Sequence, residues 1–119
     1  MNARTDITPY FADDATFSIV GGPSARGRDA AVETIRGIHY VSFDSHVRIE
    51  RTFHGDGHAA AELVFVGTHV GDFAGLAPTG RAVEVPYCVV YDFTEEGRIS
   101  ALRAYFPLHV LMAQLSGEA

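Results

Sequence analysis

The chain has 119 residues, 47% apolar and 20% charged, a composition typical of one globular domain with its own core. No apolar run could span a membrane, and no signal-peptide pattern opens the chain. The net charge is −6 and the nine basic residues, all arginine, are scattered, so a nucleic-acid partner and a membrane partner are not expected. The single cysteine, Cys88, cannot form an internal disulfide, which predicts a reducing, cytoplasmic location.

The first third of the chain predicts two helices and one strand. Residues 6–13 are interpreted as a short helix, since Pro9 is tolerated in a first turn. Residues 15–20 form an apolar run that predicts a strand, ended by glycines and a proline. A helix is predicted over 29–37, with Gly37 or the following His39-Tyr40 pair ending it.

Strands dominate the rest of the chain. Long alternating segments predict strands over 46–53, 58–69 and 81–93, and a shorter one over 98–106. The tail 108–115 is amphipathic but short. Helix, strand and helix followed by antiparallel strands predict a single α+β domain over 1–119, with a curved sheet wrapped on short helices.

Alternation along the strands sorts their residues into two faces. One face is predicted to line an apolar interior pocket, with a wall formed by Leu63, Phe65, Val89, Tyr91 and Phe106. The opposite face also carries apolar residues, namely Val64, Val66, Cys88 and Val90. An apolar face left over after the core is filled is typical of a subunit interface, so we expect a homodimer.

Several short motifs, in order along the chain, carry a family resemblance. They are Tyr10-Phe11-Ala12-Asp13-Asp14-Ala15, Gly67-Thr68-His69-Val70-Gly71, Pro78-Thr79-Gly80, Glu96-Gly97-Arg98-Ile99 and Gln114-Leu115. Together they resemble the SnoaL-like polyketide cyclases of the NTF2-like superfamily, which also holds ketosteroid isomerase and limonene-epoxide hydrolase. The resemblance implies a cone-shaped α+β barrel with a deep apolar pocket, often dimeric. The long N-terminal helix usual in the family is expected to be absent, because only nine residues precede Tyr10.

The catalytic residues of these relatives do not carry over to this chain. Counted back from Gln114, the cyclases' general-base Asp falls at Pro107. The carboxylates of ketosteroid isomerase fall at Ile19 and Val89. The Arg and first Asp of the epoxide hydrolases fall at Tyr87 and Val89. The resemblance therefore supports the fold more strongly than any one of the three mechanisms.

Two titratable side chains are candidates for acid/base chemistry. His69 is the last residue of the predicted strand over 58–69 and lies on the same inward face as Leu63 and Phe65. It is predicted to be the proton acceptor; alternatively it fixes the Gly-rich turn that follows. Tyr87 is predicted to donate a hydrogen bond to an enolate oxygen, or alternatively to fill the core. Arg51 is predicted to bind the substrate, although an ion pair with Glu62, or a strand bulge that reverses its face, would remove it from the pocket.

The remaining histidines are not assigned to a catalytic or metal site. His54 and His58 flank a hairpin with Asp56, but they lack a further ligand with matching spacing, so no metal is predicted. His39, Tyr40 and His109 are predicted at loop ends and are interpreted as surface groups; alternatively they rim the mouth of the pocket.

The sequence thus predicts a cofactor-independent acid/base enzyme that resembles the cyclases. It would catalyse aldol-type cyclisation or isomerisation of a small apolar, polyketide-like or polycyclic substrate through an enolate. Two alternatives stay open: a small-molecule-binding protein without catalysis, and an epoxide-opening cyclase or hydrolase with an unusual residue set.

Overall fold

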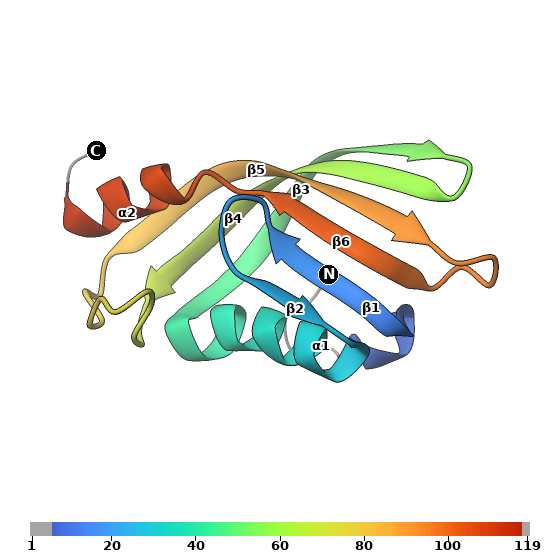
Figure 1. Ribbon diagram of the computed structural model, residues 1–119. Coiled ribbons are helices and arrows are strands. Elements are labelled where there is room, and N and C mark those ends of the chain that lie inside the picture. Colours follow the sequence, from blue (N-terminus) through green and yellow to red (C-terminus); the bar gives the residue numbers. More distant parts are fainter. Residues whose placement is uncertain (1–5, 118–119) are drawn as a thin grey trace.

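A computed structural model describes residues 6–117 as one curved six-stranded sheet with helices against its concave face and at one end (Figure 1). The strand order is β2-β1-β6-β5-β4-β3, and every neighbouring pair is antiparallel except β1 and β6, which are parallel. The predicted α+β class is therefore confirmed. The elements are η1 (Thr8–Tyr10), β1 (Phe11–Ile19), β2 (Ser24–Arg26), α1 (Arg28–Arg36), η2 (Gly37–Ser42), β3 (Phe43–Gly55), β4 (His58–His69), β5 (Ala82–Phe93), β6 (Ile99–Tyr105) and α2 (Leu108–Ser116).

The N-terminal segment differs from the prediction of a helix over 6–13. Only one 3-10 turn forms there, and the chain is already extended at Phe11, where β1 begins. Phe11 and Ala15 are buried in the core, and Phe11 lies opposite Ile99 of β6. Burial of these side chains and pairing with β6 outweigh the local signals for a helix.

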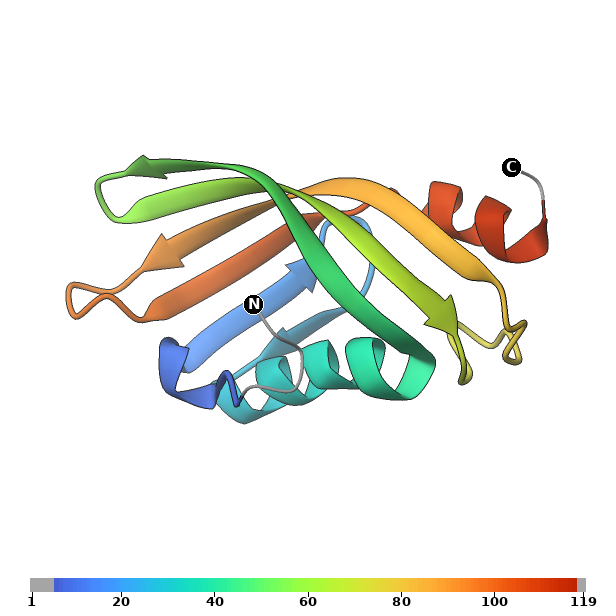
Figure 2. The same cartoon turned by 180° about the vertical axis from the view of Figure 1, so that it is seen from behind.

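The strands β3, β4 and β5 form the long twisted part of the sheet, and α1 packs beneath its concave face (Figure 2). Gly57, in the left-handed region at φ 74°, turns β3 into β4. A core between α1 and the sheet includes Ala31, Val32 and Ile35 from the helix. No helix within residues 6–117 is long and apolar enough to cross a bilayer.

Helix α1 ends at Arg36, with Gly37 as its C-cap, as the sequence predicts, but a second helical segment follows it directly. Gly37 keeps helical backbone angles, and the chain continues as the π-helical segment η2 up to Ser42. Short π-helical segments recur at functional sites, because they shift side chains out of the regular helical phase. His39 lies on this segment, so it is carried along the concave face of the sheet and not onto a surface loop.

Candidate active site

A partly open cavity of about 110 Å³ lies between the concave face of the sheet, α1, η2 and α2. Most of its wall is apolar. The wall reaches the surface at Ile49, which is 53% exposed. All five wall residues predicted from the sequence line this cavity: Leu63, Phe65, Val89, Tyr91 and Phe106. Tyr87 lines it as well. The cavity's polar side chains are His39 and these two tyrosines.

His39 is the histidine that reaches the cavity. Its Nδ1 lies 2.6 Å from Oγ of the buried Ser45, and its ring lies 5.4 Å from the ring of Phe65. Burial disfavours the imidazolium ion and lowers the pKa of His39 to about 4, so the ring is neutral at pH 7. When Nδ1–H donates to Ser45, the lone pair on Nε2 is left to accept a proton.

The two tyrosines place hydroxyl groups in otherwise apolar surroundings. The ring of Tyr87 packs edge-on against Phe106, with the centroids 5.0 Å apart, and Phe106 in turn packs on Phe65. His39 and Tyr87 are therefore linked by a continuous row of aromatic rings. Burial raises the pKa of Tyr87 well above its usual range and also raises that of Tyr91. Both hydroxyls consequently stay protonated and able to donate.

His69 lies outside the cavity wall, contrary to its predicted role as the proton acceptor there. It is fully buried against Phe43, with ring centroids 5.1 Å apart. The backbone N–H of Thr79 donates to Nδ1 at 3.1 Å, which places the proton of the neutral ring on Nε2. The lone pair is thus already engaged, and His69 has the alternative role of fixing the turn.

The Gly67–Gly71 segment supports η2, and with it His39. A Cβ at Gly67 would lie 2.6 Å from Cβ of Ser45, and one at Gly71 would lie 2.0 Å from the carbonyl oxygen of Val41. Both separations are impossible contacts, so the strand approaches η2 and the start of β3 only because these residues are glycines. The N–H of Gly71 also donates to the carbonyl of Ser42 at 3.0 Å.

Arg51 does not face the cavity, which corrects the prediction that it binds substrate. The pairing of β3 with β4 shifts register between Ile49 and Arg51, and this irregularity turns the Arg51 side chain to the outer face. There its Nε lies 3.1 Å from Oε1 of Glu62, and both side chains are largely exposed. Such an exposed pair adds little to stability.

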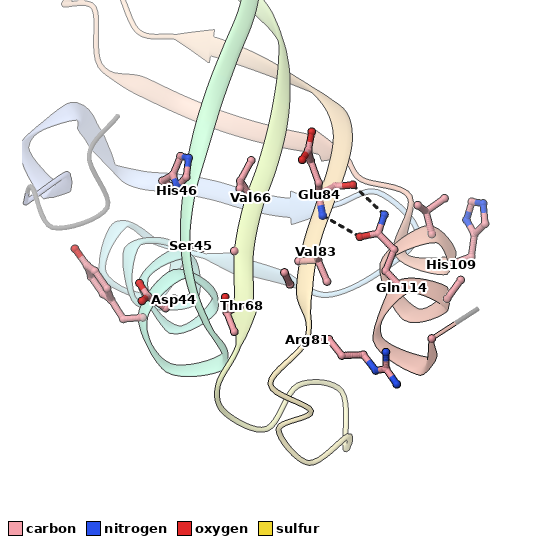
Figure 3. Close-up of a pocket in the computed structure, with 16 residues that line it drawn as sticks. Asp44, Ser45, His46, Val66, Thr68, Arg81, Val83, Glu84, His109 and Gln114 are labelled. Carbon is pink, nitrogen blue, oxygen red and sulfur yellow. Dashed lines mark hydrogen bonds between the residues drawn. The ribbon is translucent and has the colours of Figure 1, made fainter. Parts of the chain in front are cut away.

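A second, larger hollow lies on the outer face of the sheet, between β3, β4, β5 and α2 (Figure 3). It is an open groove of about 1270 Å³ with a polar rim that includes Asp44, His46 and His109. The Gln114 side chain joins α2 to β5 here: its Oε1 accepts from the N–H of Glu84 and its Nε2 donates to the carbonyl of Glu84, both at 2.9 Å. The groove is more open to water than the cavity on the concave face, and its rim is more polar than the wall of that cavity.

His58, at the start of β4, lies beside an ion pair on the neighbouring strands. Nδ1 of His58 lies 2.9 Å from Oδ1 of Asp92, whose carboxylate also accepts from Arg103. Hydrogen bonds from Arg103 and His58 lower the pKa of Asp92 to about 2. No group of three or more potential metal ligands is found within residues 6–117.

Sequence reasoning missed His39 and Ser45. The sequence analysis places His39 at a loop end, because it expects Gly37 or the His39-Tyr40 pair to end the helix. The spacing of Ile35, Ile38 and His39 is that of one helical face, and it would have placed the imidazole beside the core.

Comparison with known protein families identifies the family of this chain. The model of the SnoaL-like polyketide cyclase family matches residues 4–115. The chain belongs to the SnoaL-like polyketide cyclase family. Similar solved structures agree with this assignment at the level of the fold. A SnoaL-like polyketide cyclase homologue from Jannaschia sp. CCS1 shares 17% identity over 96% of this chain and 81% of its own, with a TM-score of 0.86.

Two further structures resemble this SnoaL-like chain. A protein from Xanthomonas campestris pv. campestris, described as a polyketide cyclase, is 23% identical over 92% of this chain and 82% of its own, with a TM-score of 0.80. A protein from Catenulispora acidiphila DSM 44928 with a ketosteroid isomerase-like fold is 21% identical over 92% and 79%, with a TM-score of 0.77.

The structure of this SnoaL-like chain also locates Pro107, the residue at the expected general-base position. Pro107 precedes α2 as its N-cap and borders the outer face of the sheet, not the cavity. Ile19 and Val89, the other apolar replacements, do line the cavity. The apolar wall therefore extends over two positions at which the resemblance to ketosteroid isomerase would place carboxylates.

Proposed function

We propose that this protein catalyses proton transfer at a carbon atom next to a carbonyl group, with His39 as the base and Tyr87 as the hydrogen-bond donor. The observation that carries the proposal is the hydrogen bond between His39 and Ser45 beside an apolar cavity. A neutral imidazole oriented by a second group is one arrangement that can act as a general base. The family assignment supports a cyclase or isomerase reaction class.

The steps balance in protons. Nε2 of His39 removes the α-proton of the substrate, and the negative charge develops on the carbonyl oxygen, which accepts a hydrogen bond from the Tyr87 hydroxyl. In an isomerisation, the imidazolium returns the same proton to the γ-carbon. In an aldol-type closure, the enolate carbon attacks a second carbonyl of the substrate, and the resulting alkoxide takes the proton from His39.

The direct test is exchange of the α-hydrogens of cyclohexanone for deuterium in D₂O, followed by NMR. His39→Gln should lower the protein-catalysed exchange rate by about 100-fold or more, and Tyr87→Phe by a similar order. His109→Gln and Tyr105→Phe, which alter the same residue types on the outer face, should leave the rate unchanged. If both cavity variants exchange as fast as wild type, the assignment of His39 and Tyr87 fails.

The pH dependence of the exchange rate gives a second measurement. Since the pKa of His39 is lowered to about 4, the basic form dominates at every pH above about 5. The protein-catalysed rate should therefore rise with pH around 4 and then level off through neutrality. The raised pKa of Tyr87 keeps its hydroxyl protonated, so no fall is expected below about pH 10. A midpoint near 6.5 would point to a solvent-exposed histidine instead.

Binding without catalysis is the second candidate function. It is favoured by the apolar residues at the expected carboxylate positions, Ile19 and Val89, which leave the cavity with few polar groups. Saturable binding of cyclohexanone without any protein-catalysed exchange would support it. An epoxide-opening reaction is a further proposal, tested by hydrolysis of cyclohexene oxide with and without the His39→Gln change.

A further inference from the structure

The size of the cavity limits what it can hold. Its volume is about 110 Å³, whereas sites for drug-sized ligands usually span about 300–1,000 Å³. A dry apolar cavity of about 150 Å³ in an engineered protein holds one benzene molecule. The cavity of this protein thus has the volume of roughly one small ring, far below that of a fused polycycle.

The lack of charged residues in the cavity wall limits the charge of the ligand, just as the volume limits its size. No Asp, Glu, Lys or Arg is among the described residues that line the cavity. The groups that could pair with an ion are His39, which is neutral at pH 7, and the protonated Tyr87 and Tyr91. Moving a carboxylate or an ammonium group out of water without a partner of opposite charge is unfavourable by several kcal/mol.

The aromatic side chains shape the space between these polar groups. Phe43 and Phe106 both pack edge-on against Phe65, with their ring centroids 5.3 and 5.7 Å from that of Phe65. His39 packs on the same Phe65 ring, and Tyr87 lies at the far side of Phe106. A compact ring seated along this row has a proton acceptor and a hydroxyl donor within the same cavity.

We propose that the substrate is an uncharged compound with a single carbocyclic ring that carries a carbonyl group, and that fused polycyclic and ionised compounds are excluded. This inference rests on the proposed function, because it takes the cavity as the reaction site. It narrows the substrate expected from the sequence, which included polycyclic compounds.

Binding of a matched set of ligands tests the proposal without any turnover. The probes are cyclohexanone, cyclohexanecarboxylate and cyclohexylammonium, which share one ring and differ in charge, and 2-decalone and androstenedione, which are neutral and larger. Each is titrated into ¹⁵N-labelled protein at pH 7. Cyclohexanone should shift the amide signals of Leu63 and Val89 but not those of His109 and Ala113 in the outer groove. The two ions and the larger ketones should bind at least 10-fold more weakly.

A variant with a larger cavity tests whether cavity size sets the ligand preference. Leu102 is buried in the wall, and Leu102→Ala removes a side chain whose volume should let 2-decalone bind. Tyr105→Phe on the outer face should leave the ligand preference as in wild type. If Leu102→Ala does not fold, the wild-type ligand series still decides the question.

Three results would overturn the proposal: equal binding of 2-decalone and cyclohexanone by wild type, equal binding of cyclohexanecarboxylate and cyclohexanone, or no binding of cyclohexanone at the cavity. Failure of the proposed function is recognised separately. In that case cyclohexanone binds with the expected selectivity, but its α-hydrogens exchange no faster than in buffer.

Discussion

His39 and His69 show how two histidines on neighbouring elements acquire different chemistry. Nδ1 of His69 accepts a backbone N–H, which occupies its lone pair and leaves the proton on a buried Nε2. Nδ1 of His39 instead contacts a serine hydroxyl, which can donate or accept and so allows either tautomer. Only His39 can therefore offer a lone pair to a ligand without breaking a backbone contact.

The buried, neutral state of His39 predicts a specific dependence of stability on pH. Its pKa is about 4 in the folded protein against 6.5 ordinarily, so between these values only the unfolded chain binds the proton. The contribution to stability is fully present above pH 6.5, is lost as pH falls toward 4, and changes no further below that. Between pH 6.5 and 5 the loss is about 2 kcal/mol.

Urea unfolding of wild type and His39→Gln at a series of pH values measures this loss. The difference between the two free energies of unfolding isolates His39, because every other titrating group is common to both proteins. The difference should change by about 2 kcal/mol between pH 6.5 and 5, in the direction of relative loss for wild type. Parallel curves over this range would show that His39 is not buried in its neutral form.

At the scale of elements, the end of β4 acts as the support on which η2 rests. Gly67 lies opposite Ser45 in the β3–β4 pairing, and the absence of a side chain there allows the Ser45 side chain to reach His39. The glycines of this segment are thus explained by close approach of neighbouring backbone and side-chain atoms, and not by turn formation.

Gly67→Ala should destabilise the protein by about 1–3 kcal/mol, because the new Cβ meets both Cβ of Ser45 and the carbonyl oxygen of Asp44. The same change should shift the imidazole NMR signals of His39. Gly37→Ala is the matched control: Gly37 has helical angles and no atom within 4 Å of a new Cβ, so this change should stabilise by about 0.5–1 kcal/mol. Equal stability of Gly67→Ala and wild type would contradict the close approach.

The elements that could be predicted from the sequence are those whose side chains alternate clearly. The predicted strand over 58–69 matches β4 at both ends, and the strand over 81–93 differs from β5 only at its first residue. The helix over 6–13 fails because Phe11 is held extended by β6, a partner far away in sequence. Local patterns carry no information about such a partner. The inward position of His39 was within reach of the sequence, because His39 shares a helical face with Ile35 and Ile38 once the helix is continued past Gly37.

At the scale of the whole molecule, the outer face of the sheet is the surface for which a second copy is proposed. Val66, Cys88 and Val90 are half-buried there, while Val64 is already buried within the single chain. We propose that two copies pair through this face, as the apolar alternation in the sequence predicts.

Light scattering coupled to size-exclusion chromatography tests the homodimer. Wild type should elute with twice the mass of one chain, and Val90→Arg should shift the mass toward that of one chain, because a buried arginine without a partner is unfavourable at an interface. Val20→Arg, at an exposed position beyond the end of β1, should leave the mass unchanged. A wild-type mass of one chain at micromolar concentration would refute the dimer.

The parallel pairing of β1 with β6 has a consequence for the order of events during synthesis. These two strands lie near opposite ends of the chain, and β6 is the strand that joins β1 to the rest of the sheet. During translation, β1, β2 and α1 emerge early but cannot join β3, β4 and β5 in one sheet until β6 is available. The cavity therefore closes only when nearly the whole chain has left the ribosome, and a nascent chain stopped before residue 99 should have no ligand site.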